Sequence, residues 1–182
     1  MILALDPGTT QTAYVCWDGS RVVECGIVAN DELLAILRAA GRYDGVQTVA
    51  VEMIASYGMP VGREVFETCV WIGRFVENVK VPWRLVYRMD AKLHLCHTTK
   101  AKDGNIRQSL LDRFGPVGTK KSPGPLYGVK THIWAALAVA VFAMESTDAQ
   151  TLQQSDVDAN RGKANRGVVA GRRNAGRNRP RN

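Results

Sequence analysis

The fold is decided by the stretch Met1-Ile-Leu-Ala-Leu-Asp6-Pro-Gly-Thr-Thr10-Gln-Thr-Ala-Tyr-Val15. Its apolar residues predict a short strand that ends in the carboxylate of Asp6. A tight Pro-Gly-Thr-Thr turn follows, and a second strand leaves at once. A carboxylate at the end of a strand, with backbone amides exposed beside it, suits a metal ion or a phosphate. The remaining sequence has to indicate which of the two ligands is bound.

A second apolar run, Thr48-Val-Ala-Val-Glu52, also ends in a single acid. Runs of this kind are typical of strands that are buried on both faces. If the two strands are neighbours, Asp6 and Glu52 meet, and two such carboxylates repel each other unless a cation neutralises them. The alternative is that each acid merely ends its strand in solvent. The two acids together, with the turn after Asp6, favour the functional interpretation.

The third informative segment is Gly128-Val-Lys-Thr-His132-Ile-Trp-Ala-Ala-Leu-Ala-Val-Ala-Val-Phe142. It predicts a helix of small apolar residues that can pack closely on a sheet. His132 lies near the start of this helix. A single histidine in such a place is more often structural than a ligand, so the residue types alone leave its role open.

The pattern along the chain predicts an α/β domain. Asp18-Gly19 is typical of a hairpin turn between the second and third strands. We expect strands at 2–6, 12–17, 21–28, 48–52 and 83–87, and helices at 31–41, 60–79, 103–114 and 129–145. Three antiparallel strands followed by helix, strand, helix and strand give a mixed five-stranded sheet with two parallel additions, flanked by helices.

The expected helix 60–79, with Pro60 in its first turn, is apolar on two sides. One stripe is typical of a core-facing surface and contains Val61, Val65, Cys69, Ile72, Val76 and Val79. A second stripe of Phe66, Val70 and Gly73 flanks it. A helix with two apolar surfaces has to cover both, and a second copy of the chain could cover one of them.

Composition and charge limit the class of protein. The chain has 182 residues and a formal net charge of +7, and its length suits one domain. We expect one folded domain at 1–146 and a disordered tail at 147–182 that is rich in Arg, Asn and Gly. Most of the net charge lies in that tail, which suits a sequence-independent contact to nucleic acid or a merely solubilising role. No signal peptide or membrane span is apparent, because a span needs about 20 apolar residues. We therefore expect a cytoplasmic protein.

The segments quoted above resemble the RuvC-type Holliday junction resolvases of the RNase H-like superfamily, especially the small forms found in bacteriophages. The matching pieces are Leu5-Asp-Pro-Gly-Thr-Thr-Gln-Thr-Ala13, Val49-Ala-Val-Glu52 and His132-Ile-Trp-Ala-Ala-Leu-Ala-Val-Ala140. The segments Asp90-Ala-Lys-Leu-His-Leu-Cys-His97 and Lys100-Ala-Lys-Asp-Gly-Asn-Ile-Arg107 resemble the basic region before the family's penultimate helix. The resemblance covers roughly residues 1–145 and implies a crossover junction endodeoxyribonuclease, in the bacterial host cytoplasm if it is phage-encoded.

The resemblance implies metal-dependent catalysis, and the chemistry of phosphodiester cleavage agrees with it. Two Mg²⁺ ions about 3.5–4 Å apart can activate the attacking water and stabilise the leaving oxygen. The family pattern assigns Asp6, Glu52 and His132 as catalytic metal ligands. It also places an acid three residues after the third ligand, where this chain has Ala135. Asp90 and Asp103 are the nearest acids that could fill the gap, and with a histidine ligand Mn²⁺ could serve in place of Mg²⁺.

The resemblance also implies branched DNA as substrate and a homodimer whose twofold axis matches that of the junction. In the family the helix after the second acid builds the dimer interface, which corresponds to 60–79 here. Candidate DNA-binding residues are Lys92, Lys100, Lys102, Arg107, Lys120, Lys121 and Tyr57. The last of these could stack on an unpaired base. No single lysine matches the family register.

Three alternatives stay open at this point. The chain could be another RNase H-like nuclease that acts on RNA or on flap or fork DNA. It could bind junctions without cutting them, which Ala135 permits. An ATPase of the actin and sugar-kinase superfamily has a similar phosphate loop, but that architecture needs a second such domain and about twice the length.

Overall fold

The computed structural model describes residues 1–146 except 40, 42, 57 and 59. Within unit Met1–Met144 the strands are β1 (Ile2–Pro7), β2 (Gln11–Trp17), β3 (Val22–Ala29), β4 (Thr48–Met53) and β5 (Trp83–Tyr87). The helices are α1 (Asn30–Arg38), α2 (Arg63–Asn78), α3 (Arg88–Cys96) and α4 (Asp103–Phe114), and residues 133–146 form a further helix. The tail expected at 147–182 lies outside the described residues.

The five strands form one mixed sheet in the order β3-β2-β1-β4-β5. β1 pairs antiparallel with β2, and β2 pairs antiparallel with β3. β4 is parallel to β1, and β5 is parallel to β4. The predicted α/β fold, with three antiparallel strands followed by parallel additions, is confirmed.

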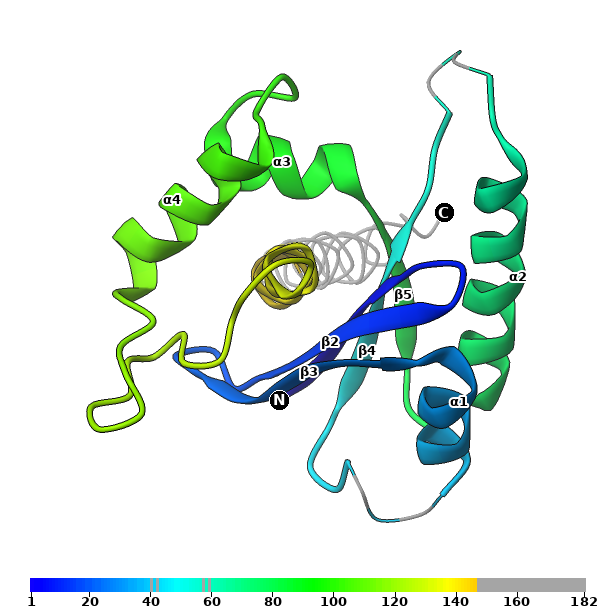
Figure 1. Cartoon of the computed structure of the whole chain (residues 1–182), viewed down its shortest axis with the longest axis horizontal. Helices are drawn as coiled ribbons and strands as arrows, with labels where there is room; N and C mark the ends of the chain where they lie inside the picture. The colour runs from blue at the N-terminus through cyan, green and yellow to red at the C-terminus, as the bar shows by residue number, and fades with distance from the viewer. Residues whose placement is uncertain (40, 42, 57, 59, 147–182) are drawn as a thin grey trace, which may run out of the picture. The chain divides into compact units, whose positions relative to one another are not determined.

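Helices cover both faces of the sheet, so the central strands are apolar on both sides (Figure 1). On one face, Leu3, Leu5 and Val51 pack against Leu33 of α1 and Phe75 of α2. On the other face, the alternate residues of the same strands pack against α3, α4 and the helix 133–146; this second core includes Ala4, Val15, Trp17, Ala50, Val86, Leu110 and Leu137. The carboxylates of Asp6 and Glu52 follow Ala4 and Ala50 by two residues, and therefore point to this second face.

Three predicted helix boundaries were wrong, and each has a local cause. α2 begins at Arg63 after an extended Gly62, so Pro60 lies before the helix and not in its first turn. α1 ends at Arg38, before the predicted 41. The last helix begins at 133 and not at 129, because Thr131 has a φ of 43° that a right-handed helix does not accept. His132 therefore precedes the helix.

Helix α3 was not predicted at all. It follows β5 without a loop, and it ends where His97 adopts a left-handed conformation with a φ of 56°. Ala91 and Leu95 are its buried residues, four apart on one face, and they join the second core. No helix within the described residues is both long and apolar enough to cross a membrane.

We predict that the second core carries much of the stability. Leu137 is completely buried, so Leu137→Ala should lower the free energy of unfolding by about 2–5 kcal/mol. Leu93 of α3 is 52% exposed, and Leu93→Ala should change it by no more than about 0.5 kcal/mol. Urea unfolding followed by circular dichroism measures both. Equal effects of the two substitutions would contradict the placement of the helix 133–146 on the sheet.

Candidate active site

The strand register brings Asp6 and Glu52 together. Leu5 of β1 is paired with Val51 of β4, so the next residue of each parallel strand carries one of the two acids. β1 and β4 are adjacent in the sheet, and both carboxylates point to the same face. The expectation that the two acids meet at neighbouring strand ends is confirmed by this geometry.

Burial makes this pair of carboxylates energetically demanding. The pKa of Asp6 is raised from 3.8 to about 8, first by burial and then by the charge of Glu52 and hydrogen bonding to it; Arg88 acts in the opposite direction. Glu52 is 8% exposed, and its Oε2 is buried without a hydrogen-bond partner. A buried acceptor without a partner costs free energy that a cation or donor recovers. At neutral pH Asp6 therefore keeps its proton.

Arg88 is the cation that contacts this pair. It is the first residue of α3, directly after β5, and its Nη1 donates to Oε1 of Glu52 at 3.2 Å. Its Nη2 donates to Oδ1 of Asp103 at 2.7 Å. The side chain is 42% exposed, so the guanidinium joins a buried acid to a solvent-exposed one.

Two hollows meet at Glu52 and Arg88, which line both of them. One hollow is also lined by Asp6, Pro7, Met53, Ile54, Ala55, Met89, Lys92 and Thr99; we call it the Asp6 hollow. The other is also lined by Ala91, Asp103, Ile106, Thr131, His132, Trp134, Ala135, Ala138 and Val139; we call it the Ala135 hollow. Each hollow thus has two carboxylates, Asp6 and Glu52 in one and Glu52 and Asp103 in the other, and in the second hollow position 135 offers only a methyl group.

The structure brings the three proposed ligands only partly together. Asp6 and Glu52 face each other, whereas His132 is exposed and lines the Ala135 hollow with Glu52. Among the described residues, no three His, Cys, Asp or Glu side chains form a group that could hold a metal ion. On that side the guanidinium of Arg88 pairs with Glu52. Asp103, which pairs with the same arginine, lines the Ala135 hollow, whereas Asp90 lines neither hollow.

The predicted DNA-binding residues are distributed around the site. Lys92 lines the Asp6 hollow, and Lys100 and Lys102 are exposed in the segment between α3 and α4. Arg107 of α4 lies over the ring of Trp134, with 5.3 Å between its Cζ and the ring centroid.

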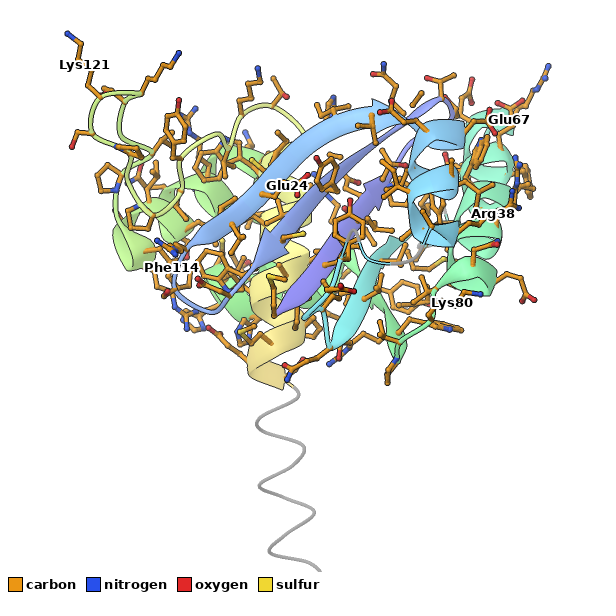
Figure 2. All side chains as sticks on the ribbon, turned by 90° about the horizontal axis from the view of Figure 1, so that it is seen from below. Glu24, Arg38, Glu67, Lys80, Phe114 and Lys121 are labelled. Atoms are coloured by element: carbon orange, nitrogen blue, oxygen red, sulfur yellow. The ribbon has the colours of Figure 1, made fainter. Side chains whose placement is uncertain are left out.

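The other two predicted lysines belong to the loop that follows α4. Lys120 and Lys121 are exposed there, and the end of this loop projects from the body of the fold at Lys121 (Figure 2). Tyr57 lies outside the described residues. The DNA-binding roles of these side chains stay predictions.

Sequence reasoning missed Arg88. The same signal that singled out the two acids was present, since Arg88 is the first residue after the predicted strand 83–87, which ends beside Glu52 in the sheet. A polar side chain at the end of a third parallel strand falls on the same edge as the ends of the other two.

Comparison with known proteins supports the fold. The structure of RuvC from Thermus thermophilus matches with a TM-score of 0.55 and 19% identity, over 78% of this chain and 91% of that chain. T. thermophilus RuvC in complex with a Holliday junction substrate matches with a TM-score of 0.57 and 19% identity, over 78% and 90%. No protein-family model matches the sequence, and no curated protein matches it. The chain therefore has a RuvC-like fold, and at this identity the likeness shows the fold alone.

The raised pKa of Asp6 predicts an unusual pH dependence of stability. The folded protein keeps a proton near pH 7 that the unfolded chain loses near pH 3.8, so the stability of the metal-free protein should fall as the pH rises from 3.8 to about 8. Asp6→Asn removes the titrating group and should be more stable than the wild type at pH 7.5 by at least about 1 kcal/mol.

Urea unfolding in chelator across this pH range measures the difference. Asp18→Asn is the control, because Asp18 has a lowered pKa and accepts hydrogen bonds from Ser20 and Arg21. Asp18→Asn should be less stable than the wild type above about pH 3.8, where the ionised Asp18 stabilises the folded protein. Parallel pH profiles for the wild type and Asp6→Asn would contradict the assignment.

Proposed function

We propose that this protein is a divalent-metal-dependent endodeoxyribonuclease that resolves Holliday junctions or similar branched DNA by paired nicks in a homodimer. The observation that carries the proposal is the pair formed by the half-buried Asp6 and the buried Glu52 at adjacent ends of two parallel strands. This pair lies on a RuvC-like fold, and one of the matching structures is RuvC in complex with a Holliday junction substrate.

The residues present fit a hard divalent cation. The buried Oε2 of Glu52 has no partner, and burial and the charge of Glu52 raise the pKa of the facing carboxyl of Asp6 to about 8, so that a cation beside it would favour its ionised form. Mg²⁺ prefers oxygen ligands and is commonly bound by one or two carboxylates, with water and substrate phosphates completing its shell. Asp6 and Glu52 would hold such an ion, and His132 on the neighbouring hollow would favour Mn²⁺ as an alternative. The ion would supply charge stabilisation and an acidified water for phosphodiester hydrolysis.

The protein's own groups would bind and place the DNA backbone. Lys92 lines the same hollow as Asp6, and Arg88 lies between that hollow and the next. Phosphate contacts from such groups give affinity without sequence preference and depend on salt. The basic residues 147–182 would add to this attraction.

A second copy of the chain would cover the exposed side of α2. Phe66 is 61% exposed and Val70 is 63% exposed, and they are four residues apart on one face of the helix. The opposite side of α2 packs on the sheet through Ile72 and Phe75. Twofold pairing of α2 with its copy would present two equivalent sites to a junction of matching symmetry.

We predict metal-dependent, paired nicking of a labelled immobile four-way junction. Asp6→Asn and Glu52→Gln should each lower the rate by more than about 100-fold, because loss of a ligand costs more than the 10–100-fold typical of residues behind the ligands. Glu32→Gln in α1, which is exposed on the other layer of the fold, should cut like the wild type. The rates are measured in Mg²⁺ and in Mn²⁺.

The outcomes of this assay separate the remaining functions. Cutting of flap or fork DNA in preference to the junction would favour a different RNase H-like nuclease. Tight junction binding without cleavage in either metal would favour a non-catalytic junction-binding protein, which the methyl group at position 135 permits. Either result would contradict the proposed resolvase.

We also predict that Val70→Asp prevents dimerisation without unfolding the chain. The carboxylate would be buried at the twofold interface, which costs several kcal/mol of association free energy. Val23→Asp is the matched control, since Val23 is 54% exposed on the edge strand β3. Sedimentation velocity should show a monomer for Val70→Asp and a dimer for Val23→Asp. A dimer in both variants would exclude this face of α2 as the interface.

A further inference from the structure

The Ala135 hollow has a feature that the paired carboxylates do not explain. A RuvC-like site would need oxygen ligands on both sides of Glu52 to hold two ions, and the residue at position 135 supplies none. In its place, the guanidinium of Arg88 reaches Glu52 at 3.2 Å and Asp103 at 2.7 Å. This side of the site therefore already contains a fixed positive charge.

The charges on the two sides of Glu52 differ accordingly. On the Asp6 side, the half-buried Asp6 and the buried Glu52 face each other, and Oε2 of Glu52 has no hydrogen-bond partner. On the Ala135 side, Arg88 donates hydrogen bonds to Glu52 and to Asp103, and these two contacts fix the position of its guanidinium. The remaining polar side chains there are Thr131 and His132, which are both exposed. The Asp6 side keeps a carboxylate oxygen without a partner, although Lys92 and Arg88 also line that hollow. On the Ala135 side, Arg88 already pairs with both acids.

We propose that the site takes a single divalent ion, on the Asp6 side, and that Arg88 supplies the positive charge that a second ion would supply on the Ala135 side. The inference rests on the proposed nuclease function and specifies how its site is built. Asp103 is a positioning residue in this arrangement, because it holds the second nitrogen of the guanidinium. With only one ion to bind, the site needs no carboxylate at position 135, which accounts for the alanine there.

Arginine suits this role for chemical reasons. Its guanidinium is charged at every accessible pH and donates two parallel hydrogen bonds to a phosphate. It cannot acidify a bound water as a metal ion does, so its contribution is confined to holding the phosphate and stabilising negative charge on it. The side chain of Arg88 is 42% exposed, so a backbone phosphate can reach it.

The first test is the number of ions. Mn²⁺ bound to the full-length protein is counted by electron paramagnetic resonance, free and with a four-way junction. We expect one ion per protomer in the wild type. The double variant Arg88→Met with Ala135→Asp removes the guanidinium and adds a carboxylate, and we expect two ions in it.

The possible counts separate this inference from the proposed function. Two ions in the wild type would overturn the inference while leaving the nuclease proposal intact. No bound ion at all would overturn the inference together with the metal dependence of the proposed function. A count that stays at one in the double variant would contradict the role given to position 135.

The second test measures the contact of Arg88 with phosphate. The dependence of junction affinity on salt should have a slope smaller by about 1 in Arg88→Met, because one phosphate contact is lost. Arg88→Lys keeps the charge and should keep the slope. Arg38→Met is the matched control, since Arg38 of α1 is exposed and its Nε donates to Asn78 of α2, in the layer on the other face of the sheet.

A merely structural role of Arg88 would change stability but not the salt dependence. An unchanged slope in Arg88→Met, with circular dichroism showing a folded protein, would overturn the inference. If Arg88→Met does not fold, Asp103→Asn gives the same comparison. Asp103→Asn removes the carboxylate that holds the guanidinium of Arg88, so it should weaken junction binding at low salt although it also removes a negative charge. Tighter binding would contradict the positioning role of Asp103.

Discussion

The site depends on one constraint, which is that two carboxylates are held side by side in a place that water reaches poorly. The parallel pairing of β1 and β4 places Asp6 beside Glu52, and in this packing Glu52 is buried and Asp6 half-buried. Like charges in such a place cannot both ionise without a cation, and the result is the raised pKa of Asp6. The fold thus holds an unfavourable interaction that a bound cation would relieve.

The elements around this pair have complementary tasks. The helix 133–146 is built from small apolar residues, including Ala136 and Ala140, which are fully buried and let it approach the sheet closely. α3 begins at the strand end, so Arg88 reaches the acids without an intervening loop. α4 contributes Asp103 at its first residue, where a carboxylate also interacts favourably with the helix dipole. The site is therefore formed by the ends of elements, and its sides by their packed faces.

Much of the fold could be predicted from the sequence, because the strands are short apolar runs bounded by turn residues. The meeting of Asp6 and Glu52 was also predictable, since acids at the ends of two neighbouring parallel strands fall on one edge. α3 was not, because its nine residues bury only Ala91 and Leu95 and carry no long apolar period. The pairing of Arg88 with Glu52 joins residues 36 positions apart, and such a contact depends on the complete sheet. The place of His132 before its helix depends on the backbone at Thr131, which no apolar pattern records.

The most direct measurement of the central claim is the number of protons released when a divalent ion binds. Calorimetric titration of the full-length protein with Mn²⁺ at pH 7, in buffers of different ionisation enthalpy, gives this number. If Asp6 holds a proton that the ion displaces, about one proton should leave per bound ion, and none should leave in Asp6→Asn. A binding heat that is independent of the buffer would show that the carboxylates hold no proton to displace. That result would contradict the account of the site as a paired, cation-seeking centre.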